Sequence, residues 1–186
     1  MRLKVVVCLI VALLFTGCKN TSAPLENAIS LRNKILASNG CSFSATVTAD
    51  YGDAVYHFSM DCTADKEGNL TFRVTEPETI AGIQGKLTAT GGALTFDDQV
   101  LAFPTLADGE ISPVTAPWVF MKTLRSGYMR CCTEGNSSYQ IEIDDSYEED
   151  ALRLLISIND YVPTNGEIFW NGRRVITINV EHFAFL

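Results

Sequence analysis

Hydrophobic residues recur along this chain with two different periods, and the change of period separates a helix from a series of strands. From Pro24 to Ser38 the apolar residues fall largely on one side of a helix, and Pro24 suits its first turn. The pair Asn39-Gly40 is a typical helix stop. From Cys41 onward, apolar and polar residues alternate, which predicts β-strands.

The alternating segments follow one another closely enough to form antiparallel pairs. They are Cys41 to Ala49, Val55 to Cys62, Leu70 to Val74, Gly85 to Thr90, Ala93 to Asp97, Val100 to Phe103, Tyr139 to Ile143, Ala151 to Ile158, Glu167 to Trp170 and Arg173 to Phe183. We predict two-residue turns at Tyr51-Gly52, Gly91-Gly92, Asp98-Gln99 and Asn171-Gly172. These registers keep the apolar residues on one face, so we expect about ten or eleven strands in a single domain.

A second helix is predicted from Trp118 to Arg125, after a proline-bearing loop and before Gly127. Thr115 could cap this helix and Pro117 could start it. Its apolar residues point in nearly every direction, so a single core-facing stripe does not account for them. Two interpretations stay open: the helix fills the concave side of the sheet as core, or it covers an apolar cavity as a lid.

The first seventeen residues have the pattern of an export signal. Basic residues precede an apolar run from Val5 to Phe15, which is too short to remain as a membrane span. The segment ends in Phe15-Thr16-Gly17-Cys18, which resembles the lipobox of bacterial lipoproteins, where the cysteine is acylated and becomes the N-terminus. We therefore expect a signal peptide at 1–17, a lipidated tether at 18–23 and one domain at 24–186. The alternative is an ordinary secretory signal with an unrelated cysteine.

Composition argues against several classes of function. Fourteen basic and 22 acidic residues give a net charge of -8, which opposes binding to nucleic acid. We find no nucleophile elbow, phosphate-binding loop or zinc-protease motif, and the only two histidines, His57 and His182, read as surface or edge residues. The acidic segment 144–150 reads as a solvated hairpin end, since it lacks a calcium-loop pattern. We expect no catalytic residues, no metal and no cofactor.

The cysteines allow several oxidation states in an exported protein. In the predicted first hairpin Cys41 lies opposite Cys62, within reach of a disulfide, and the alternative is two buried thiols. Cys131 and Cys132 are neighbours, so they could form a vicinal disulfide, bond to another cysteine or remain free.

Two stretches of the sequence resemble the LolA/LolB-like superfamily of bacterial lipoprotein carriers and lipid-binding lipoproteins. The first is Phe72-Arg73-Val74 with Glu76-Pro77 and Ile80 to Gly85, and the second is the last hairpin, from Pro163 through Glu167 to Gly172 and on to Phe183. The resemblance spans about residues 22 to 186. It implies an α+β, mainly β fold: an open, strongly curved antiparallel half-barrel with the N-terminal helix and a short lid helix on its concave side.

The resemblance also implies a function without a cofactor. The leading expectation is a membrane-anchored lipoprotein that binds lipid or lipoprotein acyl chains in an apolar cavity. The cavity and lid candidates are Phe43, Val47, Phe58, Met60, Phe72, Leu87, Leu94, Phe96, Trp118, Phe120, Met121 and Leu124. The alternative is an interaction or scaffold lipoprotein that holds or activates another envelope protein and carries no lipid. A core filled by Trp118, Phe120 and the first helix would favour this second function.

The same interpretation gives a location and an oligomeric state. We expect a monomer held at a membrane through the acyl chains on Cys18, palmitate among them. The site would be extracytoplasmic: the outer face of the cytoplasmic membrane in a monoderm, or an envelope membrane in a diderm.

Cys18→Ser should release the protein into the soluble fraction, because buried acyl chains contribute about 0.8 kcal/mol per CH₂ and the acidic domain has no attraction to anionic lipid. Fractionation of cells followed by immunoblotting measures this. Cys8→Ser is the matched control, since Cys8 leaves with the signal peptide and its loss should change nothing. Retention of the Cys18→Ser protein at the membrane contradicts the lipoprotein prediction.

Overall fold

The computed structural model describes residues 23–96, 99–103, 106–107, 110–134, 138–148 and 151–186. The predicted export signal, Cys18 and nearly all of the tether lie outside these residues. Within the described ranges, no helix is both long and apolar enough to span a membrane.

The described residues form two α-helices, one short 3-10 helix and a long series of strands. In chain order they are α2 (Ala23–Ala37), β1 (Gly40–Asp50), β2 (Val55–Asp65), β3 (Leu70–Glu76), β4 (Gln84–Thr88), β5 (Gly91–Phe96), β6 (Gln99–Phe103), β7 (Leu106–Ala107), β8 (Glu110–Ile111), the 3-10 helix η1 (Pro113–Thr115), α3 (Ala116–Ser126), β9 (Tyr128–Glu134), β10 (Ser138–Asp144), β11 (Arg153–Asn159), β12 (Val162–Trp170) and β13 (Arg173–Phe185).

Eleven strands form one antiparallel sheet in the order β6-β5-β4-β3-β2-β1-β13-β12-β11-β10-β9, and β7 pairs with β8 separately. The predicted mainly β fold and strand number are confirmed. Because β1 pairs with β13, the first and last strands meet at the centre of the sheet, and β6 and β9 are its two edges. The sheet is open, as expected.

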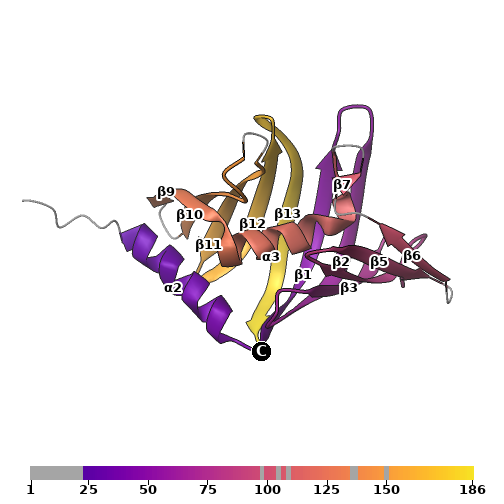
Figure 1. The fold of residues 1–186 in the computed structure, drawn as a ribbon, viewed down its shortest axis with the longest axis horizontal. Helices are drawn as coiled ribbons and strands as arrows, with labels where there is room; N and C mark the ends of the chain where they lie inside the picture. The colour runs from indigo at the N-terminus through magenta and orange to yellow at the C-terminus, as the bar shows by residue number, and fades with distance from the viewer. Residues whose placement is uncertain (1–22, 97–98, 104–105, 108–109, 135–137, 149–150) are drawn as a thin grey trace, which may run out of the picture.

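The predicted strong curvature is wrong, because the sheet is not strongly curled. Helix α3 crosses the middle of one face, over the strands around β1 and β13, while β4 to β6 extend past its N-terminal end (Figure 1). The side chains of α3 fill the space against the sheet, so the strands do not need to wrap around it to bury their apolar face.

The first hairpin has a longer turn than predicted. Asp50 pairs with Val55, and the four-residue turn between them is closed by the Tyr51 N–H, which donates to the Ala54 carbonyl at 3.0 Å. The register therefore shifts by two residues, and Cys41 faces Ala64 while Cys62 faces Phe43. A shift of two keeps every side chain on its predicted face of the sheet. The structure does not contain the Cys41–Cys62 disulfide: both residues are free, buried thiols, which was the alternative.

The other predicted turns had mixed outcomes. Asn171-Gly172 is confirmed, with both residues at positive φ (49° and 76°) between the paired Trp170 and Arg173. The Gly91-Gly92 turn is wrong: Thr88 pairs with Gly91, so the turn lies at 89–90 and both glycines belong to β5. The predicted turn at Asp98-Gln99 is also wrong, since Gln99 belongs to β6 and pairs with Phe96; residues 97–98 lie outside the described residues.

Thiol reactivity should follow burial. Desolvation raises the pKa of Cys41 and, most strongly, of Cys62, where the nearby Asp61 carboxylate adds to the effect. A raised pKa leaves less reactive thiolate at any given pH, and Cys131 is exposed. A maleimide should therefore label Cys131 first in the native protein, and Cys41 and Cys62 only after unfolding. Mass spectrometry of peptides, without reductant, measures this; a Cys41–Cys62 bridge in the purified protein contradicts it.

Candidate functional site

Helix α3 is part of the core over almost its whole length. The side chains of Trp118, Phe120, Met121 and Leu124 are all at most 5% exposed. The Phe120 ring lies so close to the backbone of β12 that a Cβ added at Gly166 would meet it at 2.7 Å. Glycine is therefore required at 166 for this close approach.

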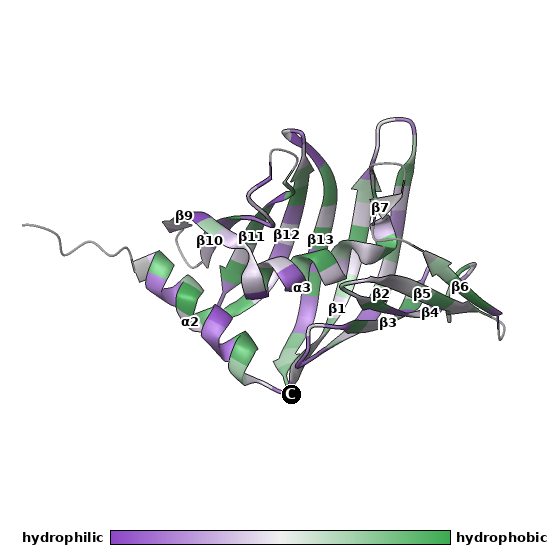
Figure 2. Cartoon of the chain, in the orientation of Figure 1, coloured by the Kyte–Doolittle hydropathy of each residue, from purple (hydrophilic) through white to green (hydrophobic). Residues whose placement is uncertain are grey.

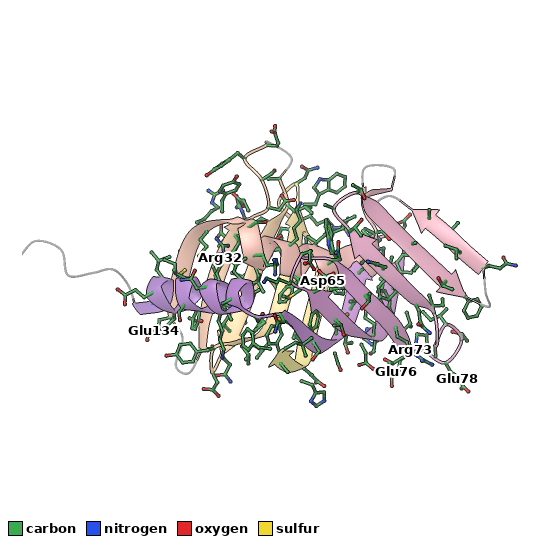
Figure 3. The ribbon with its side chains drawn as sticks, turned by 60° about the horizontal axis from the view of Figure 1, so that its bottom comes forward. Arg32, Asp65, Arg73, Glu76, Glu78 and Glu134 are labelled. Atoms are coloured by element: carbon green, nitrogen blue, oxygen red, sulfur yellow. The ribbon has the colours of Figure 1, made fainter. Side chains whose placement is uncertain are left out.

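Polar contacts hold α3 at both ends. The Trp118 indole N–H donates to the Gly68 carbonyl at 3.1 Å, in the turn between β2 and β3. Near the other end, the Arg32 guanidinium of α2 donates from Nε to the Leu124 carbonyl at 2.7 Å (Figure 3). A cation at a helix C-terminus also complements the helix dipole. Burial lowers the pKa of Arg32, but arginine stays protonated at any pH the fold survives. The helix is thus fixed in place.

Ten of the twelve predicted cavity and lid residues belong to one packed core. They are Phe43, Val47, Phe58, Met60, Phe72, Leu87, Trp118, Phe120, Met121 and Leu124. They do come together, but as side chains packed on one another between the sheet and α3. The remaining two, Leu94 and Phe96 on β5, lie outside this core, with Leu94 partly buried and Phe96 47% exposed.

An open apolar groove of about 430 Å³ lies at the N-terminal end of α3. Its lining residues are Tyr51, Tyr56, Phe58, Ile80, Ile111, Ser112, Pro113 and Val114. The Tyr51 hydroxyl donates to the Ile111 carbonyl, and its ring meets the Tyr56 ring edge-on at 6.2 Å. These contacts tie the tip of the first hairpin to the segment that leads into α3. We did not predict this groove: of its lining residues only Phe58 was among the predicted cavity candidates, and the turn at Tyr51-Gly52 was predicted two residues too short.

A second apolar surface lies at the sheet edge formed by β5 and β6. We call it the apolar edge and define it as Leu94, Phe96, Val100 and Leu101. Leu94 pairs with Leu101, so these two share a face, while Val100 lies on the opposite face of β6. Val100 is 69% exposed and Leu101 65% exposed. Figure 2 shows β6 as a hydrophobic strand at the outer end of the sheet.

The apolar edge stands in an acidic part of the chain. Between Thr75 and Met121 there are six acidic residues and a single basic one, Lys86, a net charge of -5 out of -8 for the whole chain. Figure 3 shows Glu76 and Glu78 near the end of β3, with Arg73 close to them. A binding partner for this surface must therefore tolerate, or complement, negative charge.

The polar hollows elsewhere are self-neutralised. In one of them, of about 570 Å³, Arg130 lies 2.9 Å from Asp144. In another, of about 420 Å³, Arg153 lies 3.3 Å from Glu142. Arg130 and Arg153 are thus each paired with a carboxylate, while Arg32, which also lines the first hollow, donates to the Leu124 and Thr123 carbonyls. Among the described residues no group of three or more His, Cys, Asp or Glu side chains could hold a metal ion.

Comparison with known proteins gives similarity of structure only. No protein-family model matches the sequence, and no curated protein matches it. The chain is similar to a LolA superfamily protein from Nitrosomonas europaea, at 10% identity over 86% of this chain and 93% of that one, with a TM-score of 0.44. It is similar to lipoprotein LppX from Mycobacterium tuberculosis, at 10% identity over 88% and 96%, with a TM-score of 0.45.

A third similar structure is the complex of the CwlD amidase with the GerS lipoprotein from Clostridioides difficile. The identity is 15% over 91% of this chain and 99% of the matched chain, with a TM-score of 0.43. The structures to which this chain is similar over most of its length thus include a member of the LolA superfamily, which two stretches of the sequence also resemble. Similarity at this level assigns no ligand and no partner to this protein.

Phe120→Asp should unfold the domain or destabilise it by at least about 4 kcal/mol, because it buries an unpaired charge in a packed core. Phe96→Asp is the matched control: its ring is 47% exposed, so the loss should stay below about 1 kcal/mol. Urea unfolding followed by circular dichroism measures both. If Phe120→Asp leaves the transition unchanged, α3 is a loosely packed lid and not core.

Proposed function

We propose that this protein is an extracytoplasmic interaction lipoprotein, anchored through Cys18, that binds another envelope protein through its apolar edge. The observation that carries this proposal is the position of α3. Its large side chains occupy the concave face of the sheet, where an enclosed lipid would otherwise lie. Among the apolar side chains that remain exposed, Phe96, Val100 and Leu101 lie on the paired strands β5 and β6.

Exposed apolar area of this kind carries a cost in water. A fully buried Leu, Val or Phe gains about 1.5 to 3 kcal/mol over an exposed one, so a partner that covered Phe96, Val100 and Leu101 would recover several kcal/mol. Contiguous exposed apolar residues on a soluble domain are typical of protein-interaction sites. We expect this chain itself to have no catalytic activity. Where the partner is an enzyme, the catalytic residues belong to that partner.

The groove beside Tyr51 and Tyr56 supports a second candidate function, binding of an amphipathic ligand. Its volume of about 430 Å³ falls within the usual range for small-molecule sites, and its lining is mostly aromatic and aliphatic. Because the groove is open, a bound acyl chain would remain partly in water, which lowers the affinity that burial can give. The groove could also form one end of a longer protein contact.

Native mass spectrometry of the Cys18→Ser protein, isolated without detergent from the soluble fraction of its own envelope, separates these functions. We expect a complex with a second protein and no bound lipid. Leu101→Asp, on the apolar edge, should abolish that complex, whereas Tyr56→Asp, in the groove, should leave most of it. Val55→Asp is the matched control, since Val55 is as exposed as Leu101 (65%) but lies on the interior strand β2.

The opposite result would establish the second function. A bound lipid mass that disappears with Tyr56→Asp, together with no protein partner, would contradict the interaction proposal and support a lipid-binding groove.

A further inference from the structure

The two edges of the sheet are built differently. Edge strand β9 carries Arg130 and Glu134, and an extra residue at Arg130 interrupts its pairing with β10. Helix α2 packs beside it. Charges, bulges and covering helices are the features by which proteins prevent another strand from pairing with an edge. Edge β9 is therefore protected.

Edge strand β6 has none of these protections along its five residues. Its sequence, Gln-Val-Leu-Ala-Phe, contains no charge and no proline, and its pairing with β5 runs from Gln99 to Phe103 without a register shift. An edge strand exposes a row of backbone N–H and C=O groups that are not paired within the sheet. In β6 this row is accompanied by apolar side chains on both faces, with Val100 on one and Leu101 on the other.

The exposure of both faces restricts what can bind. A lipid or a helix lying on the concave side would cover Leu101 and leave Val100 in water. A strand that paired with β6 would place its own alternating side chains beside both residues, and it would also satisfy the backbone groups of the edge.

The net charge of the segment that contains this edge restricts the partner further. Residues 75 to 121 carry a net charge of -5, so two copies of this chain meeting edge to edge would bring like charges together. A segment with basic residues would instead complement them. The repulsion between two acidic copies and the attraction to a basic segment both favour a different protein, and not a second copy of this chain, as the occupant.

We propose that β6 is an acceptor for strand addition: an extended segment of the partner protein, apolar in its centre and basic at its ends, pairs with β6 as a twelfth strand. This inference rests on the proposed function, in that it specifies how the envelope partner is held. The recognised chemistry is a peptide backbone in extended conformation, flanked by lysine or arginine.

A synthetic peptide tests the mode of binding without knowledge of the partner. The probe is Lys-Lys-Val-Thr-Val-Thr-Val-Lys-Lys, blocked at both ends, added to the full mature chain carrying Cys18→Ser. Hydrogen exchange should show slower exchange of the β6 amides on addition of the peptide and no change in β9. The same peptide N-methylated at alternate residues keeps its composition but cannot pair, so its affinity should fall at least about tenfold.

Variants of the protein locate the contact. Val100→Lys puts a charge on the acceptor strand and should weaken peptide binding at least about tenfold, while Val55→Lys, equally exposed but away from either edge, should change it less than about twofold. Equal binding of the N-methylated peptide, or peptide binding without protection of β6, overturns the inference. So does a dimer with protected β6 amides in the absence of peptide, which would make a second copy the occupant.

The outcome separates this inference from the proposed function. If Leu101→Asp abolishes the envelope complex but Val100→Lys leaves it intact and the peptide does not protect β6, the partner binds the face of the apolar edge that carries Leu101 without strand addition, and only the inference fails. If the peptide pairs with β6 but no partner is found in the envelope, strand addition stands and the proposed function fails.

Discussion

An eleven-stranded open sheet with one apolar face cannot remain single-layered in water, and the cover over that face determines most of this structure. Helix α3 supplies the central part of the cover, with Phe120 seated against the bare backbone at Gly166. Because α3 crosses strands from both halves of the sheet, it joins the β1–β6 half to the β9–β13 half through one set of contacts. The same helix is too short to reach β5 and β6, so Phe96, Val100 and Leu101 on these strands remain uncovered.

The periodicity of the sequence was enough for most strands but not for their turns. Alternation located strands such as β1, β3 and β10, because each has a clean inside and outside. It missed β9, whose Met-Arg-Cys-Cys run does not alternate, and the first half of β12, where Pro163 and Gly166 read as breakers. The predicted length of the first turn and the predicted positions of the turns at Gly91-Gly92 and Asp98-Gln99 were wrong. Each of these errors shifted the pairing of the strands by an even number of residues, so residues moved along a strand without changing the face they occupy.

The candidate site was harder to predict for a related reason. A helix that is apolar all round looks the same in sequence whether it is core or lid, since the difference lies in how closely the facing strand approaches. Gly166 permits that approach, but nothing near it in the sequence indicates which helix it meets. The apolar edge did have a signal: β6 is apolar on both faces, unlike the alternating strands. That composition is typical of a strand buried on both sides, and only the strand order shows that it lies at an edge instead.

The central pairing of β1 with β13 has a consequence for how the chain folds. The strand that completes the sheet, Arg173–Phe185, is synthesised long after its partner β1, because most of the other strands lie between them in the sequence. Until then the β1–β6 unit has two open edges, β1 and β6, and its inner face lacks α3 for part of that time. Such a unit is exposed to pairing with other chains during the interval. After folding is complete, β13 has covered β1, and β6 is the one edge of that unit that remains available.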